Sequence, residues 1–315
     1  MRYFARSIQF TMVVATLAMP ASAQLPDWNV VMDFEDTRDE ATDPGELVQG
    51  DCDAFLDVYE FTSDAAATIY NDVPWEVYGD GQSLKSTVQQ GSSGFGSFGG
   101  ILNLPACGME RLSEGDEVWI RFRMKFPPDF AYPNGRLKWV RLRTRDAATG
   151  DSEGYLDMYL NNPDFPVGSE RPFHLIAEFD GHWDYLGEAT DLHRLDRWET
   201  YEIYYRLNSQ SNNLAPGTGG VARIWKNGLL LAEVTDRKTL NESDSFIASI
   251  YLFTWFTNNG SPQTQSVFLD DLRITNVTPG DVDAHGNPYI GMEPLTMLFS
   301  DGFELGNTSA WSHTR

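Results

Sequence analysis

Hydrophobic and polar residues alternate along several short stretches of the chain. The clearest alternation covers residues 117–126, where Val, Ile, Phe and Met occupy one set of alternate positions and Trp, Arg and Lys occupy the other. Because successive side chains of a β-strand point to opposite faces, this pattern predicts a strand with an apolar face toward the core and a cationic face toward solvent. Further strands are predicted at residues 30–35, 136–143, 155–161, 173–179, 198–208, 247–257 and 266–275.

The connections between these strands define the fold class. Asn227 and Gly228 lie between two strand-like stretches and are a strong signal for a two-residue hairpin turn. No long stretch has apolar residues at helical spacing. We therefore predict an all-β protein, a two-sheet antiparallel β-sandwich of jelly-roll type, over residues 24–280. Residues 281–315 are predicted to be a C-terminal extension.

Three neighbouring predicted strands carry chemically versatile side chains on alternate positions. In residues 136–143 the alternation places Trp139 on the same face as Arg141 and Arg143, with Leu137 beside them. In residues 155–161 it separates tyrosines, an acid and an amide from Leu and Met. We predict that this equipped face is the floor of an open groove that holds a long, hydroxyl-rich polymer. The side chains expected there are Trp139, Arg141, Arg143, Tyr155, Asp157, Tyr159, Asn161, His174 and Glu178.

The first residues have the three parts of a secretory signal. Arg2 and Arg6 form a charged start, residues 8–19 are apolar, and the small residues 21–23 fit a cleavage site. The apolar run is shorter than the roughly twenty residues that a membrane helix needs. We predict that residues 1–23 are a signal peptide, that the mature protein is secreted or periplasmic, and that it has no integral membrane segment.

The charge of the chain limits its partners. The formal net charge is −23, and it becomes more negative when Arg2 and Arg6 leave with the signal. A surface of this sign repels polyanions, which argues against nucleic acid. Screening shortens that repulsion to about 8 Å in physiological salt, so a local cationic groove can still bind an acidic polymer.

The chain has two cysteines, Cys52 and Cys107. An exported chain meets an oxidising compartment, so we predict one structural disulfide between them, with two free thiols as the alternative.

Several phrases resemble a known family. Residues 119–130, 135–138, 198–208, 222–228 and 268–274 occur in the order seen in secreted polysaccharide lyases with a concanavalin A-like jelly roll. The resemblance covers residues 30–276 and implies this fold. It also implies a polysaccharide as the ligand and a lyase of an acidic, uronate-containing glycan as the activity.

A lyase of this kind removes a proton beside a carboxyl group. It needs a cation or amide to neutralise that carboxylate, a base and an acid for the leaving oxygen. We expect Arg141 and Arg143 to neutralise the carboxylate, His174 to act as base and Tyr159, or alternatively Tyr155, to donate the proton. The residues predicted to bind substrate are Trp139, Tyr155, Asp157, Asn161 and Glu178.

Two other functions stay open at this stage. A glycoside hydrolase would use two carboxylates about 5–9 Å apart, and Asp157 with Glu178 or Glu199 with Glu202 are the available pairs. A non-catalytic glycan-binding or surface-attachment module would use the same aromatic side chains without turnover.

Acidic residues near both ends of the predicted domain suggest a metal. In many jelly-roll carbohydrate modules the first and last strands are neighbours, and acids there hold a structural calcium through oxygen ligands. By this resemblance we predict a calcium ion on Glu35, Asp270 and Asp271, with ordinary solvated acids as the alternative.

Overall fold

The protein is described by a computed structural model that covers residues 27–32, 67–70, 83–91, 100–105, 109–132, 136–161, 171–210, 219–256 and 260–292. The predicted signal peptide, Cys52, Cys107 and Glu35 lie outside the described residues, so the disulfide stays a prediction. Within the described residues, no helix has the length and apolar character needed to cross a bilayer.

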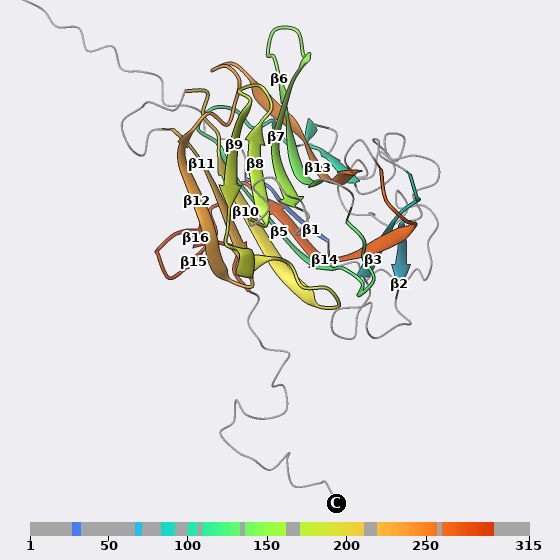
Figure 1. Cartoon of the computed structure of the whole chain (residues 1–315). Helices are drawn as coiled ribbons and strands as arrows, with labels where there is room; N and C mark the ends of the chain where they lie inside the picture. Colours follow the sequence, from blue (N-terminus) through green and yellow to red (C-terminus); the bar gives the residue numbers. More distant parts are fainter. Residues whose placement is uncertain are drawn as a thin grey trace, which may run out of the picture.

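Two antiparallel sheets form a sandwich, which confirms the predicted fold class (Figure 1). The larger sheet has the order β12-β11-β10-β5-β14-β3-β2, and β1 also pairs with β14; the smaller has the order β4-β13-β6-β7-β8-β9. The strands of the larger sheet are β1 (Asn29–Met32), β2 (Ala67–Tyr70), β3 (Ser83–Val88), β5 (Glu117–Lys125), β10 (Trp198–Arg206), β11 (Gly220–Lys226), β12 (Leu229–Arg237) and β14 (Gln265–Thr275). Those of the smaller sheet are β4 (Gly100–Asn103), β6 (Arg136–Arg145), β7 (Ser152–Asn161), β8 (Phe173–Ala177), β9 (His182–Leu186) and β13 (Phe246–Phe256).

The core lies between the inner faces of the two sheets. On β5 the predicted alternation holds, because Val118, Ile120, Phe122 and Met124 all belong to the main hydrophobic cluster. Phe122 meets the ring of Trp139 edge to face, with the ring centroids 5.1 Å apart. Burial of each such side chain contributes about 1.5–3 kcal/mol to stability before the entropy cost, so this cluster holds the two sheets together.

The predicted hairpin turn is confirmed. Asn227 and Gly228 connect β11 to β12, and both have positive φ, 50° and 78°. Glycine and asparagine adopt this left-handed geometry at low cost, and it matches the twist of the two strands. The turn therefore fixes the register of the hairpin.

The outer face of β5 differs from expectation, because its cations do not face solvent. Arg121, Arg123 and Lys125 are all buried. Arg123 pairs with Asp271 at 2.6 Å, and Lys125 pairs with Asp196 at 3.3 Å. Alternation correctly predicted which way these side chains point, but it carried no information about what covers them.

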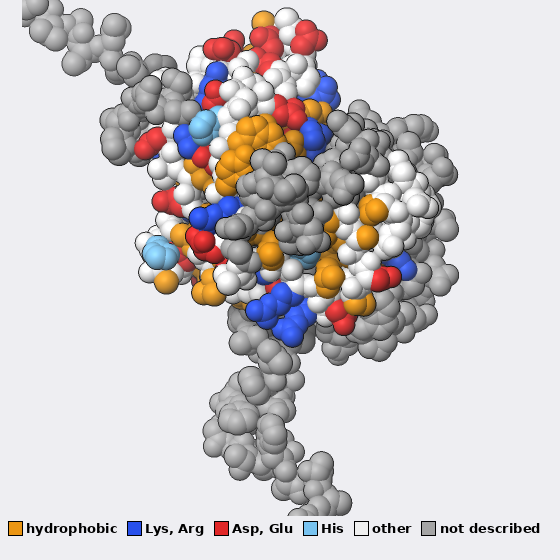
Figure 2. All heavy atoms as spheres, in the orientation of Figure 1, with side chains coloured by type: hydrophobic (Ala, Val, Ile, Leu, Met, Phe, Trp, Pro, Cys, Tyr) orange, Lys and Arg blue, Asp and Glu red, His pale blue; other side chains and the backbone are white. Residues whose placement is uncertain are grey.

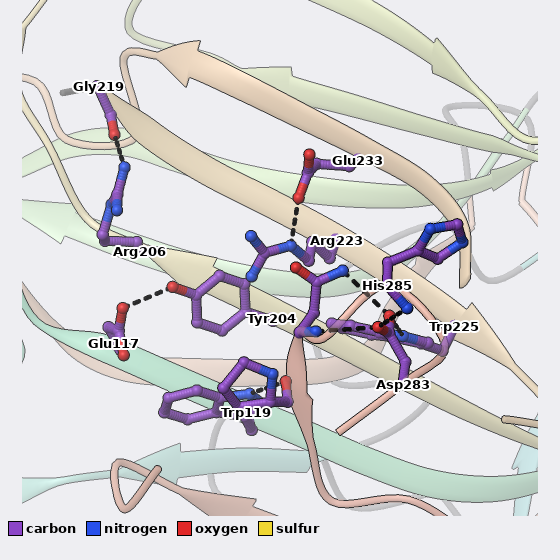
Figure 3. A network of polar contacts seen from close by, with 12 residues as sticks. Glu117, Trp119, Tyr204, Arg206, Gly219, Arg223, Trp225, Glu233, Asp283 and His285 are labelled. Atoms are coloured by element: carbon purple, nitrogen blue, oxygen red, sulfur yellow. Dashed lines mark hydrogen bonds and ion pairs between the residues drawn. The ribbon is translucent and has the colours of Figure 1, made fainter. Parts of the chain in front are cut away.

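Residues 281–292 cover part of this outer face and form the short strands β15 (Asp281–Val282) and β16 (Pro288–Tyr289). Ile290 packs into a second hydrophobic cluster with Trp119, Tyr204 and Trp225. The indole Nε1 of Trp225 donates to Asp283 Oδ2 at 2.9 Å, and that of Trp119 donates to the Pro288 carbonyl at 3.1 Å (Figure 3). The packed part of the chain therefore continues past residue 280 to at least Met292.

Glu202 anchors the end of this segment. Its carboxylate accepts hydrogen bonds from the backbone N–H groups of Ile290 at 2.6 Å and Gly291 at 3.1 Å. Arg121, opposite Glu202 in the β5–β10 register, donates to the Gly291 carbonyl at 3.0 Å. Burial raises the pKa of Glu202 to about 7 despite these hydrogen bonds. The segment is thus held by apolar packing together with buried polar contacts.

Truncation after Pro279 should destabilise the protein strongly. The loss exposes the cluster around Trp225 and leaves Glu202 without its two backbone donors, and each buried polar group left unpaired costs about 1–3 kcal/mol. Truncation after Met292 keeps every contact described above and is the matched control. Denaturant unfolding should give a midpoint well below that of the full chain for the first variant and an unchanged midpoint for the second. Equal midpoints for the two truncations would contradict a packing role for residues 280–292.

Candidate functional site

The outer face of the smaller sheet carries the predicted site residues in rows that run across the strands. In one row Lys138 of β6, Tyr159 of β7, His174 of β8 and Tyr185 of β9 are successive cross-strand partners. In the next row the successive cross-strand partners are Tyr251 of β13, Arg141 of β6, Asp157 of β7, Ile176 of β8 and Trp183 of β9. A third row joins Ser249, Arg143 and Tyr155. We call these polar and aromatic side chains, together with Glu178, the polar face.

An ion-pair cluster occupies the middle of the polar face. Arg141 Nε lies 2.7 Å from Asp157 Oδ1, and its NH2 lies 3.3 Å from Glu178 Oε1. Lys138 Nζ lies 2.9 Å from the same Glu178 oxygen and 3.6 Å from Asp157 Oδ2. Asp157 and Arg141 are buried, whereas Lys138 and Glu178 reach solvent. The cluster therefore presents a lysine and a glutamate at the surface above a buried pair.

Burial dominates the protonation of Asp157. It raises the pKa of this carboxyl to about 6, because the positive charges of Arg141 and Lys138 offset only part of the desolvation. For Glu178, which burial affects less, the hydrogen bond and charge of Lys138 and the charge of Arg141 outweigh desolvation and lower the pKa. At neutral pH both carboxylates are ionised beside two cations.

The contribution of Asp157 to the stability of the protein should decrease as the pH rises from about 4 to about 7. The folded state binds this proton more tightly than the unfolded state, so the contribution of Asp157 is complete below its usual pKa and is lost as the pH passes about 6. The stability of the wild type relative to Asp157→Asn should fall over this window by about 3 kcal/mol at most. Urea unfolding of both proteins at several pH values measures it, and a difference independent of pH would contradict the shift.

Tyr159 lies at the centre of the first row with its phenol held protonated. Burial, and then the negative charges of Asp157 and Glu178, raise the pKa of Tyr159 far above its usual value. The Lys138 ammonium lies 5.5 Å from the centre of the Tyr159 ring, and the ring of Trp183 lies 5.5 Å away on the other side. A phenol in this state can donate a proton but is a poor base.

His174 is next to Tyr159 in the same row and is fully buried. Its ring meets the ring of Tyr185 edge to face at 4.6 Å and that of Trp183 at 6.4 Å. Tyr185 is 45% exposed, so an aromatic surface borders this histidine on the solvent side of the sheet. Figure 2 shows hydrophobic side chains gathered over β8 and β9, with charged side chains of both signs around them.

Arg143 and Tyr155 of the third row contact a cation and a tyrosine of the second row. The Arg141 guanidinium carbon lies 3.7 Å from the centre of the Tyr155 ring. Arg143 NH1 donates to the hydroxyl of Tyr251 at 3.3 Å, and the rings of Tyr155 and Tyr251 meet edge to face at 5.6 Å. Burial, and then the neighbouring Tyr251, raise the pKa of Tyr155 to about 12. Arg143 and Tyr155 are only partly buried, so both are available to a ligand.

The prediction that Trp139 faces the polymer is wrong. Trp139 belongs to the main core cluster, and its indole N–H donates to the sulfur of Met124 at 3.3 Å. The reason is a β-bulge: Lys138 pairs with Tyr159 but Val140 pairs with Met158, so Trp139 is the extra residue. A bulge shifts the alternation by one position, which brings Lys138 onto the polar face.

Lys138 is therefore a site residue that strict alternation missed. The signal was present in the apolar pair Trp139 and Val140, which interrupts the period of two between Leu137 and Leu142. Two consecutive apolar residues flanked by polar ones are what a bulge needs if both are to reach the core.

Asn161 lies at the end of β7 and is fully buried. Its side-chain Nδ2 donates to the Arg171 carbonyl at 3.2 Å, and its backbone N–H donates to the Pro172 carbonyl at 2.9 Å. These contacts hold the start of β8 against β7, so the observed role of Asn161 is to position the strand that carries His174.

The alternative carboxylate pair does not form. The Glu199 carboxylate forms an ion pair with Lys226. The Glu202 carboxylate instead binds residues 290–291 on the outer face of the larger sheet. The two predicted calcium ligands that are described lie on β14, and β1 does pair with β14 as the prediction required. Asp271 is neutralised by Arg123, and among the described residues no group of three or more possible ligands surrounds a common point. Glu35, the third predicted ligand, lies outside the described residues, so the calcium site stays a prediction.

No protein-family model matches the chain, and no curated protein sequence matches it. Several solved structures have a similar fold. The alginate lyase Aly36B is 18% identical, covering 78% of this chain and 96% of its own with a TM-score of 0.46. The endo-β-1,4-glucuronan lyase of the fungus Trichoderma reesei is 12% identical (69% and 89% covered, TM-score 0.47). The alginate lyase vAL-1 of Chlorella virus is 16% identical (68% and 89% covered, TM-score 0.42). Each of these likenesses is distant, with no more than 18% of the residues identical.

Proposed function

We propose that this protein is a secreted polysaccharide lyase that cleaves a uronate-containing glycan by β-elimination. The observation that carries the proposal is the row of Lys138, Tyr159 and His174. Arg143 lies two rows away on the same face, on the strand that carries Lys138. A cation, a protonated acid and a histidine are the three kinds of group that β-elimination beside a carboxylate requires. The predicted signal peptide supports secretion.

Each group has a distinct role in the proposed reaction. Lys138 and Arg143 are partly exposed cations and neutralise the substrate carboxylate, which stabilises the carbanion formed when the neighbouring proton leaves. His174 accepts that proton, since histidine is the side chain whose charge changes near neutral pH. Tyr159 donates its phenolic proton to the glycosidic oxygen as the bond to it breaks. Arg141 is a positioning residue, because its guanidinium is buried against Asp157 and Glu178, whereas the Lys138 side chain is partly exposed.

The state of the carboxylates favours elimination over hydrolysis. A glycoside hydrolase needs two carboxyl groups that reach the sugar from either side of the bond. Both oxygens of Asp157 face cations, Oδ1 at 2.7 Å from Arg141 Nε and Oδ2 at 3.6 Å from Lys138 Nζ, so this carboxylate is not available to a sugar. Glu178 would act alone, and one carboxylate does not supply both an acid and a base or nucleophile.

A non-catalytic glycan-binding module is the second candidate. The rings of Tyr155, Trp183 and Tyr185 are the observation that favours it, because sugar rings pack on aromatic faces whether or not turnover follows. A binder has no need of the histidine next to a protonated tyrosine, and this is where the two functions differ.

The replacement of His174 separates them. Wild type should generate unsaturated uronate ends, followed by their ultraviolet absorbance, on at least one polymer of a panel of alginate, polyglucuronate and pectate. His174→Gln should lose turnover on that polymer and keep its affinity in a titration. His182→Gln, on the neighbouring strand β9, is the matched control and should keep both. Binding of a panel member by wild type without unsaturated ends would favour the binding module instead.

A further inference from the structure

A second recessed site lies outside the polar face, where the loop after β9 crosses the ends of β10, β11 and β12. It is a pocket of about 320 Å³ whose lining includes Arg194, Arg197 and Trp198. Sites for small ligands typically have volumes of roughly 300–1,000 Å³, so this pocket has room for a small group such as a sugar unit. None of its lining residues belongs to the polar face.

A buried ion pair forms the floor of the pocket. Lys226 Nζ lies 2.8 Å from Glu199 Oε1 and also donates to the carbonyls of Leu192 at 2.8 Å and Asp191 at 3.2 Å. The Glu199 carboxylate accepts from the Tyr201 hydroxyl at 2.8 Å. Both charges of the floor are satisfied within the protein, so the floor is rigid and close to neutral.

The rim of the pocket carries the charge available to a ligand. Arg194 and Arg197 are exposed, and neither guanidinium has an ion-pair or hydrogen-bond partner among the residues that the structure describes. Two other arginines of the described residues are paired with acids, Arg223 with Glu233 and Arg237 with Asp184. Two arginines that line one pocket give it positive charge, and carboxylates fit the guanidinium fork.

The walls supply apolar surface beside these arginines. Trp198 is half-buried at the start of β10, and Leu229, which follows the β11–β12 turn, is 71% exposed. An indole face next to a cation suits a ring that has one apolar side and one anionic substituent. A simple inorganic anion would use the arginines but gain nothing from Trp198 or Leu229.

We propose that this pocket is a second glycan-binding site that takes a carboxylate-bearing sugar. The sugar ring packs on Trp198 and Leu229, and its carboxylate binds Arg194 and Arg197. The pocket's own chemistry requires an anionic sugar, whereas the choice of a uronate rests on the proposed function. A site separate from the polar face would keep one part of an acidic glycan attached while another part is cleaved.

Titration of the full-length Tyr159→Phe variant, which should bind without turnover, tests the proposal. The probe is a glucuronate tetrasaccharide, and the readout is the indole N–H resonance of Trp198, assigned by comparison with Trp198→Phe. We expect this resonance to shift on titration and Arg194→Ala/Arg197→Ala to weaken that binding by at least about tenfold. Cellotetraose, a neutral chain of the same length, should leave the resonance in place.

Arg111→Ala/Arg145→Ala is the matched control, because it removes the same charge at residues outside the pocket and the polar face. It should leave the shift and its affinity unchanged. A Trp198 resonance that does not respond, that responds equally to cellotetraose, or that responds equally after either double substitution would overturn the proposal. The outcome is separate from that for the lyase: a responding Trp198 in a protein without turnover leaves the pocket standing, and turnover without a response removes only the pocket.

Discussion

Tyr159→Phe should reduce kcat on the uronate polymer by roughly a hundredfold to ten-thousandfold, the range that a positioned general acid contributes. The substitution removes one oxygen and keeps the ring that lies between Lys138 and Trp183. Affinity for the polymer should therefore change little. Initial rates at saturating polymer, together with a binding titration, measure the two effects separately.

Tyr185→Phe is the control for this prediction. Tyr185 lies in the same row and also contacts His174, but it is separated from Tyr159 by β8. Its loss of a hydroxyl should leave kcat within a few-fold of wild type. Equal rates for Tyr159→Phe and wild type would show that the leaving oxygen receives its proton from another group.

Arg141→Met should lower the free energy of unfolding more than any other single substitution on the polar face. Asp157 is fully buried, and without Arg141 its charge keeps only Lys138, at 3.6 Å, as a close cationic partner. Removal of one partner from a buried ion pair typically costs about 3–5 kcal/mol, because the other charge stays in a low-dielectric site. The free energy of unfolding from denaturant titration measures the loss.

The double variant Arg141→Met/Asp157→Leu separates the burial penalty from the value of the pair. Removal of both charges leaves an apolar patch instead of a lone carboxylate, so the double variant should recover most of the stability lost in the single variant. Arg223→Met, which breaks the more exposed pair with Glu233, should cost less than about 1 kcal/mol. A double variant as unstable as Arg141→Met would contradict this electrostatic explanation.

Much of the fold could be predicted from local pattern because strands with one buried face have a period of two. That rule correctly placed the inner face of β5 and the shared face of Tyr155, Asp157 and Tyr159. The Asn-Gly pair separately placed the turn at residues 227 and 228. The period of two failed where the backbone departs from regular pairing. The bulge at Trp139 exchanged Trp139 and Lys138 between the core and the polar face, and the exchange follows from strand pairing rather than from composition.

Long-range packing was the second limit. Arg121 on β5 looked like solvated surface, because nothing near it in the chain indicates that residues 281–292 return to contact it. The role of Lys138 within the site was not predicted for the same reason. Its contacts with Glu178 and Asp157 join residues far apart in sequence. Pairing partners decide such contacts, and one strand's own pattern does not contain them.

The mass of the oligosaccharides released by the wild type tests the central claim most directly. β-Elimination leaves an unsaturated uronate at each new non-reducing end, so every fragment that carries such an end is lighter by one water molecule than the same fragment from hydrolysis. We predict that all new non-reducing ends on a cleaved uronate polymer are of this lighter form and that Tyr159→Phe releases almost no fragments that carry them. New non-reducing ends of hydrolytic mass, or intact polymer in the presence of protein that binds it, would contradict the account.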